Sequence, residues 1–159
     1  MAETPVTDTE AMCSIAGALD VMGDRWTILV LRDTFRGIRR FDQLQADLGV
    51  ARNVLADRLA RLVEHGVLEK IQYQDRPPRF EYRLTPKGVD LSPSLVALMH
   101  WGDKHLVDDS PPVVLFHEAC STPVVQHFHC PTCDVAVTPG QLRSRHPRTD
   151  PTTSPQDRP

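Results

Sequence analysis

Two amphipathic segments joined by a glycine turn constrain the fold of this chain more than any other feature. They are RRFDQLQADLG (residues 39–49) and RNVLADRLARLVEHG (residues 52–66). Apolar residues recur in both at the three- and four-residue spacing of a helix: Phe41, Leu44, Leu48, Val54, Leu55, Leu59, Leu62 and Val63. Gly49 and Gly66 suit the left-handed conformation in which helices often end. The segments therefore predict a short helix, a tight turn and a longer helix, which is a helix-turn-helix.

The residues that follow predict a β-hairpin. VLEKIQY (residues 67–73) and RFEYRL (residues 79–84) have the composition and alternation of strands, and QDRPP (residues 74–78) lies between them. The two prolines of this linker cannot continue a helix and suit a hairpin tip. A hairpin placed directly after a helix-turn-helix is a wing.

Helices are also predicted on both sides of this motif. The first covers residues 14–22, and a second follows Asp24, whose side chain can cap it, with Trp26, Leu29 and Val30 turned inward. A later helix opens at TPKG and runs to about Leu106, with a kink or break expected at Pro93. The predicted fold is mainly α with a small β-hairpin wing (α+β), a winged helix-turn-helix.

The length and composition divide the chain into four regions. With 159 residues, 40% of them hydrophobic and 25% charged, we expect one soluble domain and a small appendage. The winged helix should occupy residues 13–109, and a Cys/His-containing hairpin residues 110–138. Residues 1–12 and the Pro/Arg-rich residues 139–159 have little to bury, so we expect both to be disordered.

Charge and hydropathy indicate which partners and which cellular compartment suit the protein. The formal net charge of −3 gives no overall attraction to nucleic acid, so any DNA-binding face must be local. The sequence contains no apolar run long enough to span a membrane, and its polar start is unlike a signal peptide. We therefore expect a cytoplasmic protein without membrane contact.

Three stretches carry a resemblance to a known family. They are CSIAGALDVMGDRW, GIRRFDQLQADLGVARNVLADRLARLVEHGVLEK and PPRFEYRLTPKG. From Cys13 to about Leu106 the chain resembles the HxlR-type winged-helix transcriptional regulators, relatives of the MarR group. The resemblance implies a homodimeric bacterial regulator that binds double-stranded operator DNA and is not an enzyme. An oxidant or a small molecule is a candidate effector.

The predicted DNA contacts follow from the helix-turn-helix docking mode, in which the start of the second helix enters the major groove. We expect Arg52 and Asn53 to reach base edges first and Arg58 next, because Arg suits guanine and Asn suits adenine. The helix start and the wing tip should meet phosphates through Arg39, Arg40, Arg76 and Arg79. We interpret Arg36, Arg61 and Arg83 as ordinary solvated surface.

Dimerisation is predicted from apolar residues in the last helix. Their number exceeds what one small domain covers, which implies a partner helix: Leu91, Leu95, Leu98, Met99 and Trp101. In a symmetric dimer the first and last helices would pack on their counterparts. The two recognition helices would then lie about one DNA turn (~34 Å) apart, and the operator would be a near-palindrome.

The first of the four cysteines is a candidate redox sensor. Cys13 lies at the entrance to the first helix, where many HxlR-type proteins carry a cysteine and where the helix N-terminus favours thiolate. The alternative is that Cys13 is only a small apolar residue beside the dimer core.

The other three cysteines lie in HEACSTPVVQHFHCPTC (residues 117–133). His117-x2-Cys120 and Cys130-x2-Cys133 have the spacing of a tetrahedral zinc knuckle, which would be structural rather than catalytic. His127 or His129 can replace His117. Many family members carry Gly after each Cys, whereas Ser121 and Asp134 here disfavour the knuckle turn. The rival interpretations are a Cys130–Cys133 redox pair and a hairpin with idle thiols. No cofactor is required for the DNA-binding function.

Two other functions compete with DNA binding. One is a zinc- or thiol-dependent redox protein centred on the C-terminal cysteines, but the sequence offers no convincing catalytic pairing or substrate pocket. The other is a winged helix used for protein–protein contact. That function would suit an acidic or apolar recognition helix, whereas this one is basic and polar.

Overall fold

The computed structural model describes residues 13–144. The chain divides into two compact units between Asp109 and Ser110. The disorder expected for residues 1–12, and for the tail beyond residue 144, lies outside the described residues.

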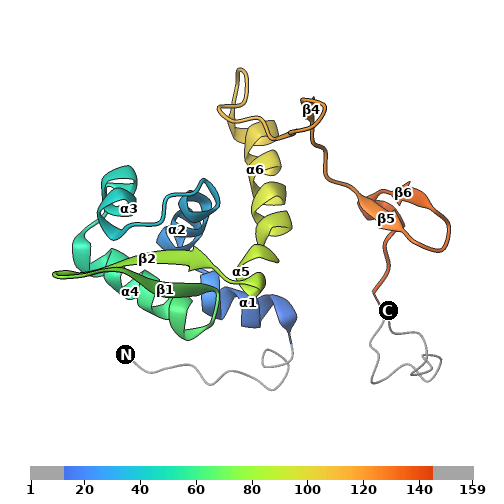
Figure 1. Cartoon of the computed structure of the whole chain (residues 1–159). Coiled ribbons are helices and arrows are strands. Elements are labelled where there is room, and N and C mark those ends of the chain that lie inside the picture. Colours follow the sequence, from blue (N-terminus) through green and yellow to red (C-terminus); the bar gives the residue numbers. More distant parts are fainter. Residues whose placement is uncertain (1–12, 145–159) are drawn as a thin grey trace. The chain divides into compact units, whose positions relative to one another are not determined.

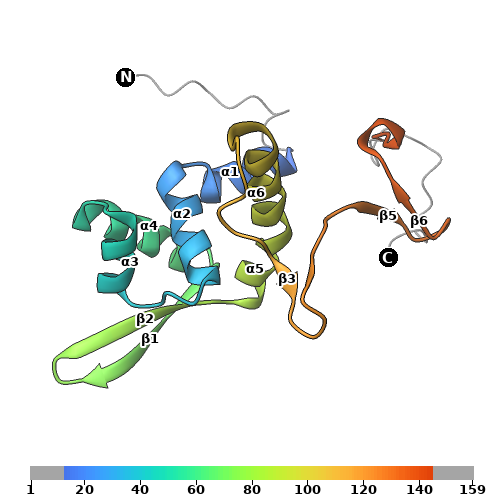
Figure 2. The same cartoon turned by 90° about the horizontal axis from the view of Figure 1, so that it is seen from above.

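The first unit is a winged helix-turn-helix, as predicted (Figure 1). Its elements in chain order are α1 (Ser14–Met22), α2 (Arg25–Phe35), α3 (Phe41–Leu48), α4 (Arg52–Glu64), β1 (Leu68–Asp75), β2 (Pro78–Leu84), α5 (Pro86–Val89) and α6 (Ser92–Leu106). The β1–β2 hairpin extends away from the packed helices (Figure 2). The break expected near Pro93 is confirmed, because α5 ends at Val89 and Pro93 lies in the first turn of α6.

Local signals in the sequence set the helix boundaries. The Asp24 carboxylate accepts hydrogen bonds from the backbone N–H groups of Trp26 at 3.0 Å and Thr27 at 3.1 Å, which caps α2. Gly49 ends α3 with φ 61°, a conformation that costs glycine little. The turn that follows is tight, and α4 begins at Arg52.

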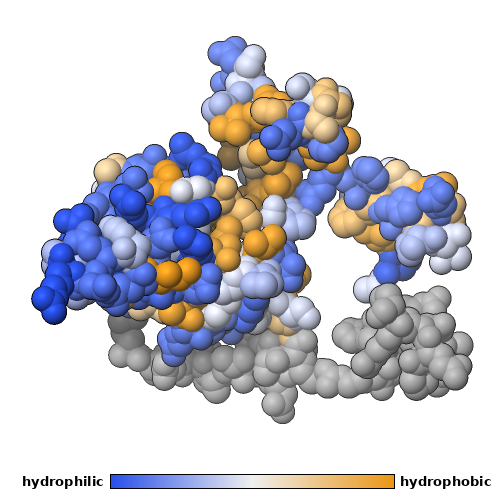
Figure 3. Space-filling model, in the orientation of Figure 1, coloured by the Kyte–Doolittle hydropathy of each residue, from blue (hydrophilic) through white to orange (hydrophobic). Residues whose placement is uncertain are grey.

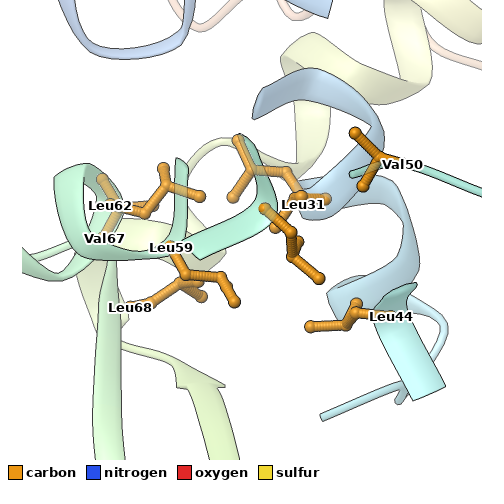
Figure 4. Packing of buried hydrophobic residues seen from close by; sticks show 9 residues of the cluster. Leu31, Leu44, Val50, Leu59, Leu62, Val67 and Leu68 are labelled. Atoms are coloured by element: carbon orange, nitrogen blue, oxygen red, sulfur yellow. The ribbon is translucent and has the colours of Figure 1, made fainter. Parts of the chain in front are cut away.

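A core of aliphatic side chains joins the helices to the base of the wing (Figure 4). The buried apolar residues are Val30, Leu31, Leu44, Val50, Leu55, Leu59, Leu62, Val67 and Leu68. Burying each such side chain contributes about 1.5–3 kcal/mol relative to exposure. The predicted core residues Phe41, Leu48, Val54 and Val63 are partly buried and pack against this cluster.

An ion-pair network around a buried carboxylate links α2 to α3, and the sequence did not predict it. Asp33 is fully buried and pairs with Arg32 at 2.7 Å and Arg36 at 3.1 Å. The same two guanidinium groups reach Asp47 of α3 at 3.3 and 3.2 Å. Arg36 is therefore part of an inter-helix ion-pair network, which corrects its interpretation as merely solvated surface. Similarly, Arg61 donates a hydrogen bond to the carbonyl of Asp20 at 2.8 Å.

The wing is fixed at its base to the helix-turn-helix. β1 and β2 pair antiparallel, from Leu68 opposite Leu84 to Asp75 opposite Pro78. The backbone N–H of Tyr82 donates to the carbonyl of Arg39 at 2.8 Å, which ties β2 to the residues just before α3. The base of the hairpin is therefore held beside the start of α3.

The second unit consists of two small hairpins, where the sequence analysis expected one. β3 (Phe116–His117) pairs with β4 (Thr122–Pro123), and β5 (Phe128–Cys130) pairs with β6 (Val135–Val137). A short 3-10 helix, Pro139–Gln141, follows in a stretch expected to be disordered. Between residues 110 and 144 no residue is buried. Across the described residues, no helix has the length and apolar character required to cross a membrane.

Candidate nucleic-acid interface

A groove lined with cations and aromatic rings lies between the wing and the starts of α3 and α4. Its volume is about 310 Å³, and we call it the basic groove. Its lining residues are Arg40, Phe41, Asp42, Arg52, Lys70, Tyr73, Pro78, Arg79, Phe80 and Tyr82. Three of the arginines predicted to contact DNA, from three separate elements, thus share one surface depression.

Cation–π contacts hold three of these cations in place. The guanidinium of Arg40 lies 4.7 Å from the centre of the Tyr73 ring, and that of Arg52 lies 4.7 Å from the centre of Phe41. The ammonium of Lys70 lies 4.3 Å from the centre of Phe80. Each contact is worth about 0.5–1 kcal/mol at an exposed site. A ring face accepts no strong hydrogen bond, so the N–H donors remain free to meet an anion.

The two helices of the motif add backbone donors to this surface. Both α3, which follows Arg40, and α4, which follows Ala51, begin without a side-chain hydrogen bond to their first N–H groups. In contrast, Asp24 caps α2 and Thr85 caps α5. Uncapped helix N-termini carry partial positive charge and unpaired N–H donors, which suit phosphate oxygens.

The remaining predicted contacts lie around the basic groove. Arg52 and Asn53 begin the first turn of α4 and are exposed. Arg39 and Arg76 are also exposed, the first just before α3 and the second in the tip that joins β1 to β2. Lys70 was not predicted, although the pairing of the strands offered a signal. Lys70 lies opposite Tyr82, and Phe80, two residues before Tyr82, is on the same face of β2.

Arg58 lies differently from the sequence expectation that it projects outward from α4. Its side chain is only 23% exposed and pairs with Asp24 at 3.3 Å, and its Nε is buried. The reason is helical spacing, since Arg58 follows Leu55 by three residues and precedes Leu62 by four, on the buried side of α4. Burial opposes the charged form of Asp24, but hydrogen bonds from Thr27, the charge of Arg58 and the Trp26 N–H together lower the pKa of Asp24 below its usual value. We therefore assign Arg58 to the α2–α4 junction rather than to base contact.

An exposed apolar face lies on the other side of this unit. Ile15 and Leu19 of α1 are 71% and 57% exposed, and Leu98 and Trp101 of α6 are 53% and 55% exposed. Hydrophobic residues are prominent along α6, whereas the surface over α3 and the wing is mostly hydrophilic (Figure 3). Leu91 and Leu95 differ from expectation, because they pack partly buried against the core of their own chain. The surface open to a partner is therefore narrower than predicted.

Cys13 precedes α1 as its N-cap residue and is exposed. Its carbonyl accepts the hydrogen bond from the N–H of Gly17 at 3.0 Å, whereas its side chain forms no capping hydrogen bond. The thiol is therefore open to solvent at the edge of the apolar face.

The predicted metal ligands lie in the turns of the two small hairpins. In the first, Nδ1 of His117 lies 3.3 Å from Sγ of Cys120. Hydrogen bonds from the side chain and backbone of Thr122 lower the pKa of Cys120. The alternative ligand His129 instead lies 3.0 Å from a carboxylate oxygen of Asp134.

In the second hairpin the two thiols interact with each other. Backbone N–H groups of Cys133 and Thr132 lower the pKa of Cys130, because they stabilise its thiolate. Cys130 in turn raises the pKa of Cys133, through their mutual hydrogen bond and then through its charge. All four cysteines are free of disulfides. Within residues 13–144, no three Cys, His or carboxylate donors lie close enough together to hold one metal ion.

Comparison with known proteins matches this chain to regulators. The HxlR-like helix-turn-helix family model matches residues 21–110. An uncharacterised helix-turn-helix-type transcriptional regulator of Mycobacterium tuberculosis is 42% identical over 126 residues, which is 79% of this chain and 80% of that protein.

Solved structures of similar fold include further regulators. The crystal structure of PA1607, described as a candidate transcription factor, aligns with a TM-score of 0.77 and 36% identity over 88% of this chain and 99% of that one. The reduced form of the redox regulator HypR aligns with a TM-score of 0.55 and 26% identity, over 58% of this chain and 92% of that one.

Proposed function

The chain belongs to the HxlR-like helix-turn-helix family of transcriptional regulators, and from this premise we propose that it binds an operator duplex as a homodimer. The first turn of α4 enters the major groove, where Arg52 and Asn53 reach base edges. Arg40 and Arg79 meet phosphates beside it, and Arg39 and Arg76 extend the contact along the backbone. The protein acts in the cytoplasm, where its DNA lies.

The convergence of Arg40, Arg52 and Arg79 on the basic groove carries this proposal. These side chains come from the start of α3, the start of α4 and the wing. Arg40 and Arg52 each form a cation–π contact with an aromatic ring. A chain with a net charge of −3 gains no DNA affinity from its overall charge. Local clustering of cations beside uncapped helix ends supplies that affinity instead.

The homodimer is proposed from the apolar face of α1 and α6. Its exposed side chains include Ile15, Leu19, Leu98 and Trp101, which a monomer would leave in water. Two copies related by a twofold axis would cover the same face on both chains and present two α4 helices to one duplex. Half-sites about one turn apart then give the operator a near-palindromic sequence.

A thiol response at Cys13 is proposed from its position. The residue is exposed and lies beside Ile15, at the start of a helix that we place at the dimer interface. The structural neighbour HypR is described as a redox regulator. A peroxide would oxidise the Cys13 thiolate to sulfenic acid, with loss of hydroxide or water, and place a polar group at the dimer contact. Cys13→Ser should therefore abolish any peroxide effect on DNA binding while binding without peroxide is unchanged.

The test of DNA binding is a mobility shift with the duplex upstream of the protein's own gene, at two salt concentrations. Arg52→Ala should weaken binding by about 1–3 kcal/mol, roughly 5- to 150-fold, and more on that duplex than on a scrambled one. Arg79→Ala should weaken both duplexes alike and reduce the salt dependence by about one counterion.

The matched control is Arg143→Ala, which removes one arginine from the second unit and should leave binding unchanged. Arg143 donates hydrogen bonds to two nearby backbone carbonyls, those of Gly140 and Leu142. Wild-type affinity and salt dependence in both groove variants would contradict the proposed docking.

A further inference from the structure

The two small hairpins contain the same turn. In the first, His117 and Cys120 are followed by Ser121 at φ 55°, and in the second Cys130 and Cys133 are followed by Asp134, also at φ 55°. The backbone N–H of Ser121 donates a hydrogen bond to the carbonyl of His117 at 2.8 Å. The N–H of Asp134 donates in the same way to the carbonyl of Cys130 at 2.9 Å.

Positive φ is costly for residues with a side chain, by about 1–2 kcal/mol. Ser121 and Asp134 are the only non-glycine residues with positive φ within residues 13–144, and they occupy equivalent places. From the sequence, the side chains of Ser121 and Asp134 are expected to disfavour a knuckle turn, yet both residues adopt its left-handed conformation. The chain therefore forms this turn twice, each time around a pair of side chains that can bind zinc.

The donor geometry within the first turn suits a metal. Ordinary Zn–S and Zn–N bonds at a tetrahedral angle place sulfur and nitrogen about 3.6 Å apart. The observed separation between Nδ1 of His117 and Sγ of Cys120 is 3.3 Å. The second turn presents Cys130 and Cys133 at the same spacing, and the same kind of hydrogen bond closes it, from the Asp134 N–H to the Cys130 carbonyl.

Neither hairpin has a buried core or a disulfide to stabilise it. Their strands are two or three residues long, no residue of 110–144 is buried, and the cysteines form no disulfide. An isolated two-stranded hairpin is marginal in water, and segments of this size depend on a disulfide or a metal.

We propose that the two turns bind one Zn²⁺ ion between them, with His117, Cys120, Cys130 and Cys133 as its four ligands. Each turn supplies two donors, and binding brings the turns together, as in small domains whose metal site forms only with the metal. His117 binds as neutral imidazole, and the three thiols lose their protons to solvent. With all four positions filled by protein, the site is structural. This inference does not depend on how the first unit binds DNA.

The experiment uses the full chain, freed of metal by a chelator under reducing conditions and then titrated with Co²⁺. The wild type should bind one ion per chain with the visible spectrum of a tetrahedral thiolate site, and Zn²⁺ should displace it. Cys133→Ser and His117→Ala should each lose more affinity than the roughly 10–100-fold that removal of a second-shell partner costs. Zn²⁺ binding should also release protons, fewer in Cys133→Ser than in the wild type.

Matched controls remove the same chemical groups elsewhere. Cys13→Ser removes a thiol and His129→Ala an imidazole, and both should bind Co²⁺ as the wild type does. Failure of the wild type to bind a stoichiometric ion would overturn the proposal, and so would a Cys130–Cys133 disulfide that forms in place of the site. An unchanged tetrahedral spectrum in Cys133→Ser, or its loss in His129→Ala rather than His117→Ala, would overturn the ligand set.

Discussion

The two units of this chain are stabilised in different ways. The winged helix buries nine aliphatic side chains completely or nearly so, from Val30 to Leu68, whereas the described residues from 110 onward bury none. Three of the four cysteines lie in that second unit. The contrast teaches that a small unit without a buried core needs another source of stability, which we propose is a metal held by the Cys and His side chains of its two turns.

Metal removal should produce the largest difference between the units. Apparent binding free energies of structural zinc in small domains are about 10–16 kcal/mol near neutral pH, and that energy is folding energy. We expect a chelator to collapse the dispersion of amide signals from residues 110–144 and to leave those of the winged helix in place. Two-dimensional NMR of labelled protein measures both at once. Equal loss of signals from both units would contradict their independence.

A cavity in the core should destabilise the winged helix and leave the second unit unchanged. Leu59 is fully buried in α4, so Leu59→Ala should lower the free energy of unfolding of the winged helix by about 2–5 kcal/mol. Metal binding by the hairpins should not change. Urea unfolding followed by circular dichroism gives the stability, and the Co²⁺ spectrum gives the second unit. Leu142→Ala, at a residue that is 43% exposed, is the control and should cost far less.

Exposed apolar residues in the two units should also differ in their effect on assembly. Trp101 lies on the proposed dimer face, and its truncation to Ala should weaken self-association by about 2 kcal/mol, roughly 30-fold, as for a central interface aromatic. Val125, which is 75% exposed in the second unit, should tolerate Val125→Ala without change. Sedimentation equilibrium across a concentration series measures both. A stable monomer in the wild type would contradict the dimer.

The smallest expected effect concerns the cap of α2. The pKa of Asp24 is lowered in the folded state, so the stability that its charge supplies is present above the unfolded pKa and is lost as pH falls through the folded value. Asp24→Asn retains a capping oxygen but not the charge beside Arg58, and we expect it to cost about 1 kcal/mol or less near neutral pH. The difference from wild type should disappear on acidification. Thermal melts from neutral pH to below pH 4 measure it, with Asp108→Asn as the exposed control.

The sequence predicted the first unit well because local signals carried most of it. Helix periodicity, the Asp24 cap and the glycine at position 49 depend on neighbours in the chain, and all three predictions are confirmed. The ion pairs of Asp33 and Arg58 were missed, because which polar side chain lies inward depends on the packing of three helices.

The second unit and the basic groove were harder to predict. Strands of two or three residues are too short to show a period, so the sequence predicts one hairpin where the structure has two. Lys70 of the basic groove was missed because its place depends on the pairing of β1 with β2 rather than on the helix-turn-helix pattern. The equivalent turns at Ser121 and Asp134 became visible only in the backbone angles.

The most direct test of the central claim is hydrogen exchange of the full chain with and without the duplex upstream of its own gene, followed by mass spectrometry. The account predicts that DNA slows exchange at residues 39–53 and 73–80, around the basic groove, and leaves residues 110–144 unchanged. Slower exchange confined to residues 110–144, with residues 39–53 unaffected, would contradict it.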